Sequence, residues 1–134
     1  MNAVMKYRII PIRQSSITKE DCINMIHLSF QERLEQGLRF TCSFMTVEDF
    51  EKKTEGKEIL VASDSENGAL MATLTYGVKL DYTGQKCAHI EYVAVSPDYK
   101  RLGLGSALIQ ECIRINSECD YISSDTAVRA KSSV

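Results

Sequence analysis

Residues 90–110 constrain the fold of this chain more than any other stretch, because they join a β-like run to an amphipathic helix through a glycine-containing loop. The apolar run ends at Val95, and Pro97 cannot donate a hydrogen bond to a sheet ladder, so the strand should end between them. Apolar residues then recur at helical spacing over a helix predicted at residues 103–117. Its apolar face comprises Leu104, Ala107, Leu108, Cys112 and Ile115.

Gly103 and Gly105 lie where this loop becomes the helix, and they remove side chains that would hold a ligand away from the backbone. The first turn of a helix leaves about four amide N–H groups unpaired, and the macrodipole adds partial positive charge there. Such a helix start suits a phosphate or pyrophosphate, and Lys100 and Arg101 would add charge at its rim. By spacing alone, the two glycines are equally consistent with a tight strand-to-helix turn. A P-loop is excluded, because the chain has no Gly-x-x-x-x-Gly-Lys-Ser/Thr sequence.

The rest of the sequence predicts two helices before a meander of strands. Thr18 and Thr46 are good N-caps, each followed three residues later by an aspartate, and the two helices should end near Gly37 and Gly56. Strands are predicted at residues 5–12, 58–63, 69–80, 86–95 and 121–127, with a tight turn at Asn67 and Gly68. The last strand should pair in parallel with residues 86–95 through a right-handed crossover.

We therefore expect one domain, residues 1–134, of the α/β class, with a mixed, mostly antiparallel sheet flanked by helices. The net charge of −2 gives no reason to expect a nucleic-acid partner. No apolar run is long enough for a signal peptide or a membrane span, so we expect a cytoplasmic protein without a membrane partner.

The five cysteines are scattered, without a Cys-x-x-Cys pair or a nearby histidine ligand, so we expect no metal site. Most of them should be small apolar core residues of a reducing compartment. A nucleophilic thiol is the alternative, but no recognisable signature ties His27 or His89 to any of them. The cysteines are Cys22, Cys42, Cys87, Cys112 and Cys119.

The segment after the predicted strand resembles the central motif of the GNAT superfamily of acetyl-CoA-dependent N-acetyltransferases. That motif is Arg/Gln-x-x-Gly-x-Gly/Ala, and it follows a strand ending in Val-x-Pro, with an aromatic residue just before the motif. The corresponding residues are Val95-Ser96-Pro97-Asp98-Tyr99-Lys100-Arg101-Leu102-Gly103-Leu104-Gly105. The likeness continues through Ser106, Ala107 and Leu108, and the order of elements resembles the family over essentially the whole chain. Lys100 departs from the pattern, because arginine or glutamine is usual there.

The resemblance implies acetyl-CoA as cosubstrate and assigns its binding residues by position. Loop and helix-start amides would bind the pyrophosphate, and the strand before the motif would pair with the pantetheine arm. The amide of Val93 would also polarise the acetyl carbonyl and stabilise the oxyanion. The implied pyrophosphate residues are Lys100, Arg101, Leu102, Gly103, Leu104, Gly105 and Ser106, and the implied pantetheine residues are Val93, Ala94 and Val95.

A base must take a proton from the amine before direct acetyl transfer. Glu91 is the first candidate, because it lies on the cofactor strand near the position where family members often carry a glutamate base. His89 falls on the same strand face by period two and would relay a proton. An exposed or cation-paired carboxylate and a structural imidazole are the alternative interpretations. Asp125 is a third candidate, and neither Tyr99 nor Tyr121 occupies the family's position for the general acid.

The family fold normally continues with another helix and two more strands beyond the last strand predicted here. We therefore expect a chain shortened at its C-terminus, with a bare sheet edge that favours a homodimer or other self-association. Phe40, Phe44 and Met45 would line an acceptor pocket or belong to the core. The expected function is acetyl transfer to a primary amine of a small molecule or peptide. The alternatives are a catalytically impaired acyl-CoA-binding module and a self-associating structural domain.

Overall fold

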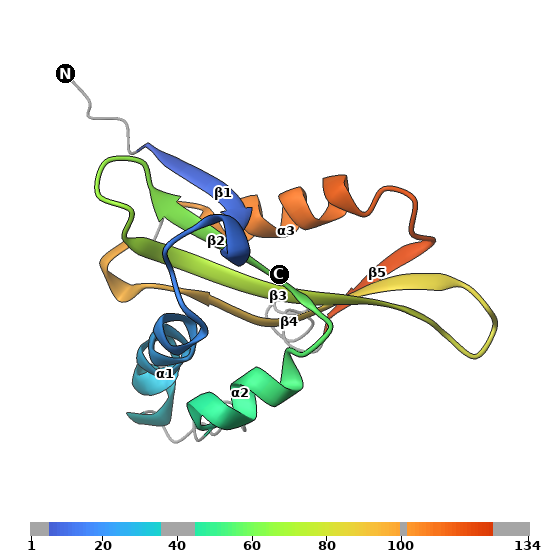
Figure 1. Ribbon diagram of the computed structural model, residues 1–134, viewed down its shortest axis with the longest axis horizontal. Helices are drawn as coiled ribbons and strands as arrows, with labels where there is room; N and C mark the ends of the chain where they lie inside the picture. Colours follow the sequence, from blue (N-terminus) through green and yellow to red (C-terminus); the bar gives the residue numbers. More distant parts are fainter. Residues whose placement is uncertain (1–5, 36–44, 100–101, 125–134) are drawn as a thin grey trace.

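The computed structural model describes residues 6–35, 45–99 and 102–124, and the predicted α/β class is confirmed (Figure 1). One five-stranded sheet has the order β1-β2-β3-β4-β5. Neighbouring strands are antiparallel except for β4 and β5, which are parallel as predicted. The strands are β1 (Tyr7–Pro11), β2 (Glu58–Asp64), β3 (Leu70–Leu80), β4 (Lys86–Val95) and β5 (Tyr121–Ser124).

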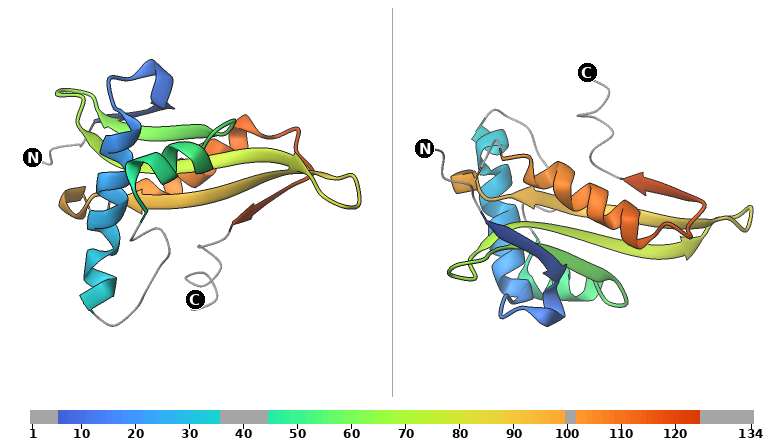
Figure 2. Two further views of the ribbon diagram at one scale, coloured as in Figure 1. Left: turned by 60° about the horizontal axis from the view of Figure 1, so that its bottom comes forward. Right: turned by 90° about the horizontal axis from the view of Figure 1, so that it is seen from above.

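Helices cover both faces of the sheet, as the two views in Figure 2 show. Helices α1 (Lys19–Glu35) and α2 (Val47–Lys53) lie on one face, and α3 (Leu104–Ile115) lies on the other. Short 3-10 turns, η1 (Ile12–Gln14) and η3 (Pro97–Tyr99), follow β1 and β4. One apolar cluster packs α1 and α2 on the sheet, and a second packs α3 on it. Burial of each large apolar side chain contributes about 1.5–3 kcal/mol, so the two clusters hold the layers together.

Both predicted helix starts form reciprocal capping boxes. The Asp21 amide donates to Thr18 Oγ1 at 3.1 Å, and the Thr18 amide donates to Asp21 Oδ2 at 2.9 Å. Thr46 and Asp49 form the same pair at the start of α2. Each box satisfies amides that the first turn leaves without intrahelical partners.

The predicted apolar face of α3 is buried at Leu104, Leu108 and Cys112 and half-buried at Ala107, but the prediction is wrong at the end of the helix. Leu104, Leu108 and Cys112 are buried, whereas Ile115 is 39% exposed. The buried stripe advances by four residues, so it continues to Asn116 rather than to Ile115. Asn116 is buried and its side-chain amide donates to the Cys112 carbonyl at 2.8 Å, which ends the helix.

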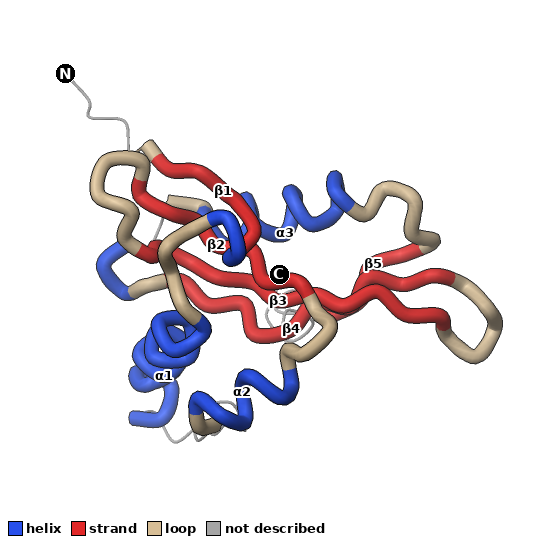
Figure 3. The backbone as a smooth tube through the Cα atoms, in the orientation of Figure 1, coloured by secondary structure: helices blue, strands red, loops and turns tan. Residues whose placement is uncertain are grey.

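The β3–β4 hairpin extends beyond the helices, with β5 beside it (Figure 3). Its turn is organised by Asp81 Oδ1, which accepts hydrogen bonds from the Thr83 hydroxyl at 2.6 Å and the Gln85 amide at 3.0 Å. The Tyr121 hydroxyl donates to the other carboxylate oxygen of Asp81 at 2.8 Å. The start of β5 is therefore fastened to the hairpin turn by a side-chain hydrogen bond as well as by the sheet.

Candidate functional site

A bulge in β4 shapes the centre of the sheet. Thr73 pairs with Ala94, but Thr75 pairs with Glu91, so two residues of β4, Tyr92 and Val93, stand opposite one residue of β3. Tyr92 has a φ of 55°, in the left-handed region that side chains other than glycine seldom adopt. Such strain persists only where the surrounding structure enforces it, which makes the bulge a candidate functional position.

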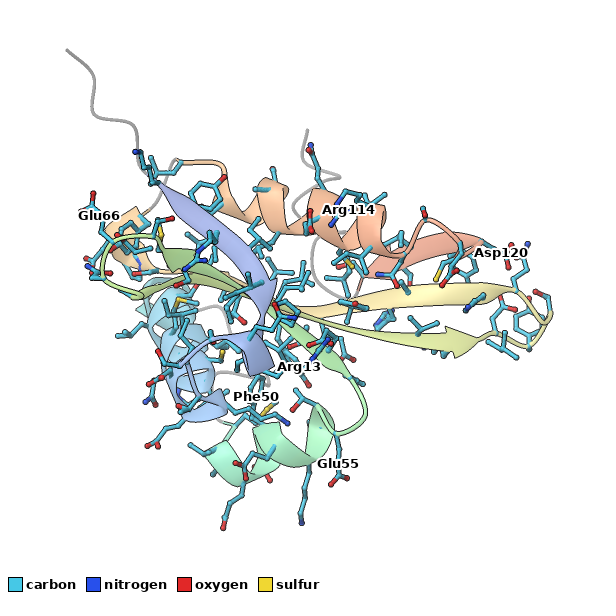
Figure 4. All side chains as sticks on the ribbon, turned by 45° about the horizontal axis from the view of Figure 1, so that its top comes forward. Arg13, Phe50, Glu55, Glu66, Arg114 and Asp120 are labelled. Atoms are coloured by element: carbon cyan, nitrogen blue, oxygen red, sulfur yellow. The ribbon has the colours of Figure 1, made fainter. Side chains whose placement is uncertain are left out.

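The bulge changes which face of the sheet each residue of β4 occupies. Strict alternation would put Val93 on the same face as Glu91, but Val93 packs in the cluster around α3. Tyr92 instead packs in the cluster around α1 and α2, where its ring meets Phe50 edge-on at 5.7 Å. Figure 4 shows Phe50 on α2 beside the sheet. The α1/α2 face of β4 therefore carries Glu91 and Tyr92 in succession.

Glu91 and His89 share this face, as the sequence predicts. Lys57, the residue before β2, brings its ammonium within 2.7 Å of Glu91 Oε1. His89 Nε2 lies 4.0 Å from Glu91 Oε2. The Glu91 side chain is 15% exposed and that of Lys57 31%, so the ion pair is partly withdrawn from solvent. Glu91 is therefore a cation-paired carboxylate that remains accessible.

The other ring nitrogen of His89 connects this pair to β5. His89 Nδ1 is hydrogen bonded to Ser123 Oγ at 2.6 Å, and Ser123 Oγ lies 3.1 Å from Cys87 Sγ. A hydrogen bond at Nδ1 fixes the orientation of the imidazole ring and holds Nε2 on the side of Glu91. Lys57, Glu91, His89, Ser123 and Cys87 thus form a row of polar contacts that runs from the segment before β2 across β4 to β5. Of these residues, the sequence predicts only Glu91 and His89 as site residues.

A pocket of about 240 Å³ opens beside the row. Its walls carry two carboxylates, two ammonium groups and the His89 imidazole. Glu55 lies at the α2 end of this wall (Figure 4). The lining residues are Glu55, Gly56, Lys57, Gly77, Val78, Lys79, His89 and Glu91. A small polar molecule would meet both signs of charge there.

Thr75 lies directly opposite Glu91 on β3. It is fully buried, and its hydroxyl has no hydrogen-bond partner among the described residues. An unsatisfied buried hydroxyl costs free energy, and such groups are few in native proteins. Thr75 lies next to the bulge, so an unsatisfied hydroxyl and a left-handed backbone meet at the same point of the sheet.

The start of α3 provides an open backbone cradle. Gly103 is the N-cap residue with a φ of 73°, and no side chain among the described residues caps the helix. Gly105 lies over β4, where an added β-carbon would stand 3.7 Å from a Val95 methyl group. Leu102, Gly103 and Ser106 are exposed. The helix start is therefore partly exposed at the end of β4, and its first-turn amides have no side-chain cap among the described residues.

The remaining candidate site residues either lie outside the described part of the chain or are packed in the hydrophobic core. Lys100, Arg101, Phe40, Phe44 and Asp125 lie outside the described residues. Met45 is 5% exposed within the α1/α2 cluster, and His27 Nε2 donates to its carbonyl at 2.8 Å. The core interpretation of Met45 is therefore correct. Tyr99 packs against the cluster around α3.

Sequence reasoning missed Lys57, Ser123 and Thr75. Lys57 and Glu91 are 34 positions apart, as are His89 and Ser123, and no local pattern links such pairs. The one available signal is Gly77, because a glycine inside a predicted strand often marks the close approach of another group.

The described residues also bear on three other kinds of site: a second pocket, a metal site and a membrane span. A larger hollow of about 390 Å³ lies between the start of α1 and the β2–β3 turn. No three metal-ligating side chains come together within residues 6–35, 45–99 and 102–124. None of the described helices has the length and apolar character that crossing a membrane requires.

Comparison with known proteins connects this geometry to a family. The model of the family described as "Acetyltransferase (GNAT) family" matches residues 21–130. No curated protein matched the sequence.

Three of the solved structures that share the fold are acetyltransferases. A Trypanosoma brucei acetyltransferase is 20% identical with a TM-score of 0.58, covering 90% of this chain and 83% of its own. Glucosamine-6-phosphate N-acetyltransferase from Arabidopsis thaliana is 19% identical with a TM-score of 0.55, covering 92% and 84%. Ribosomal-protein-alanine N-acetyltransferase from Brucella melitensis biovar Abortus is 15% identical with a TM-score of 0.59, covering 90% and 80%.

Proposed function

Because this chain belongs to the GNAT family of acetyltransferases, we propose that it transfers an acetyl group from acetyl-CoA to a primary amine of a small molecule or peptide. The observation that carries the proposal is the start of α3, where Leu102, Gly103 and Ser106 are exposed, Gly103 is left-handed, and no side chain among the described residues caps the helix. A diphosphate ligand would accept hydrogen bonds from the amides that this first turn leaves unpaired.

The residues around this helix start fit the cosubstrate that the family typically uses. The amides of Leu102, Gly103, Leu104, Gly105 and Ser106 would hold its pyrophosphate, supported by Lys100 and Arg101. Val93, Ala94 and Val95 would pair with its pantetheine arm. When bound, acetyl-CoA supplies an acetyl group activated as a thioester. The Val93 amide, next to the strained Tyr92, would donate to the acetyl oxygen as charge develops on it.

Glu91 is the base in this proposal. Its carboxylate is accessible from the pocket and held in place by the Lys57 ammonium at 2.7 Å. An amine entering the pocket would share the carboxylate with Lys57 and give up a proton to it. His89 assists as a relay, because Ser123 holds its Nδ1 and its Nε2 lies 4.0 Å from Glu91.

The names of two structural neighbours support an amine acceptor in general terms. One is a glucosamine-6-phosphate N-acetyltransferase, and another is a ribosomal-protein-alanine N-acetyltransferase. These two neighbours act on different amines, so the acceptor of this chain has to be inferred from its own pocket.

Two measurements test the function in sequence. Calorimetric titration with coenzyme A should show binding on the micromolar scale, which corresponds to about 8 kcal/mol of binding free energy. Thiol release from acetyl-CoA should then rise when primary amines are added. Binding without amine-dependent release would favour the alternative of an acyl-CoA-binding module. Absence of coenzyme A binding would overturn the proposal altogether.

A further inference from the structure

Gly77 leaves the space through which the Lys57 side chain passes along the pocket wall. A β-carbon on Gly77 would stand 3.1 Å from Lys57 Cγ and 3.4 Å from its Cδ and Cε. Gly77 has no left-handed φ, so its backbone does not require a glycine. Glycine weakens a strand interior, and it often marks the close approach of another group. Here that group is the Lys57 stem, which crosses β3 at Gly77 and ends at Glu91.

The pocket holds equal numbers of acidic and basic side chains: Glu55 and Glu91 against Lys57 and Lys79. A simple ammonium ion approaching Glu91 meets the Lys57 ammonium, which already occupies one carboxylate oxygen at 2.7 Å. Like charges repel most strongly where solvent is partly excluded. An acceptor that also carries an anionic group removes this repulsion. Its anion would pair with the Lys57 ammonium while its own ammonium pairs with the Glu91 carboxylate.

We propose that this pocket selects small zwitterionic acceptors, in which a carboxylate or other anionic group lies a few ångströms from the primary amine. Lys57 is the residue that determines this specificity. The inference rests on the proposed acetyltransferase function and names its substrate class. A volume of about 240 Å³ suits a metabolite smaller than the drug-sized ligands that fill ordinary binding pockets.

When Lys57 pairs with the acceptor's anion instead of Glu91, the Glu91 carboxylate becomes free to accept a proton from the amine. The bound ammonium gives one proton to Glu91, and its nitrogen forms a bond to the acetyl carbon as the carbon–sulfur bond breaks. The electron pair of that bond leaves on sulfur. The nitrogen then loses a second proton to solvent, and the thiolate is neutralised by a proton from solvent. Lys57 stays on the acceptor's anion throughout, so the carboxylate remains available to the amine.

Matched acceptors test the selection directly. In β-alanine a carboxylate replaces the terminal methyl group of n-propylamine, and 4-aminobutyrate is related to n-butylamine in the same way. Wild-type protein should acetylate the zwitterionic member of each pair with kcat/KM higher by about tenfold, the size expected for a hydrogen bond to a charged group. Lys57→Met keeps the stem and removes the charge, so it should abolish this preference through KM. Lys57→Arg should retain it, and Lys53→Met, outside the pocket, should not alter it.

Inhibition of the wild-type protein provides a test that needs no variant. Propionate should compete with β-alanine for the pocket, whereas propionamide should not. Equal turnover of the zwitterionic amines and the simple alkylamines, or a preference that survives Lys57→Met, would overturn the inference and leave the acetyltransferase function intact. Failure of every amine to stimulate thiol release would overturn the proposed function, and this inference with it.

Discussion

Thr75 and Glu91 face each other across β3 and β4, and within the described part of the chain only the Glu91 side chain has a polar partner. Glu91 is paired with Lys57 at 2.7 Å. The Thr75 hydroxyl is buried without a hydrogen bond among the described residues. Thr73, two residues earlier on the same face, is equally buried, but its hydroxyl lies 3.3 Å from the Leu60 carbonyl and 3.6 Å from Cys22 Sγ. The two threonines form a natural control pair.

Thr75→Val should therefore stabilise the protein. Valine has nearly the same shape and removes the desolvation cost of an unsatisfied hydroxyl, so the free energy of unfolding should rise by about 1 kcal/mol. Thr73→Val removes a satisfied hydroxyl and should lower it by about 1 kcal/mol. Urea denaturation of both variants measures the difference. Destabilisation by both substitutions would contradict this prediction, because it would mean that the Thr75 hydroxyl makes a stabilising hydrogen bond.

The two motif glycines should respond differently to alanine. Gly103 has a φ of 73°, so Gly103→Ala forces a side chain into the left-handed region at a cost of about 1–2 kcal/mol. Gly105 is helical and has room for a β-carbon 3.7 Å from Val95, so Gly105→Ala should change stability by less than about 1 kcal/mol. Denaturation midpoints compare the two. Equal losses would mean that the loop, rather than the conformation of Gly103, limits substitution.

The Asp81–Tyr121 bond predicts a specific pH dependence of stability. Hydrogen bonds from the Thr83 hydroxyl and then from Tyr121 lower the pKa of Asp81 to about 2. A carboxyl whose folded pKa is depressed stabilises the fold above its unfolded pKa, about 4, and loses that contribution as the pH falls towards 2. The bond to Asp81 raises the pKa of Tyr121, so its contribution is present below about pH 10 and is lost as the pH rises further.

Tyr121→Phe tests this dependence. The variant should be less stable than wild type at neutral pH, and the difference should shrink both below about pH 4 and above about pH 10. Unfolding midpoints in urea across that range measure it. Because other carboxylates titrate in both proteins, the informative quantity is the difference between them. A difference that stays constant with pH would contradict the role assigned to the pair.

The sequence predicts those features whose determinants lie close together along the chain. Both capping boxes join residues three positions apart, and the Gly103 helix start follows from its own motif. The Lys57–Glu91 pair depends on β2 and β4 each pairing with β3, so it follows only from the assembled sheet. The bulge at Tyr92 is also invisible in the sequence, because it depends on the register with β3 rather than on a turn residue. Candidate bases could therefore be named in advance, but not the cation beside one of them.

Separate replacement of Glu91 and His89 should identify the base. Glu91→Gln preserves shape and can still accept a hydrogen bond from Lys57, but it can no longer take a proton. If Glu91 is the base, kcat should fall by about 10²–10⁴ while coenzyme A affinity stays the same. His89→Gln should reduce kcat by about tenfold, because the histidine only assists.

Ser123→Ala serves as the matched control, since it leaves both candidate bases in place and removes only the hydroxyl bonded to His89 Nδ1 at 2.6 Å. Its effect should not exceed that of His89→Gln, because Ser123 acts through the ring. Stopped-flow measurement of thiol release and calorimetric binding separate kcat from cosubstrate affinity. A larger loss in His89→Gln than in Glu91→Gln would assign the proton to the imidazole and leave Glu91, with Lys57, the task of binding the acceptor.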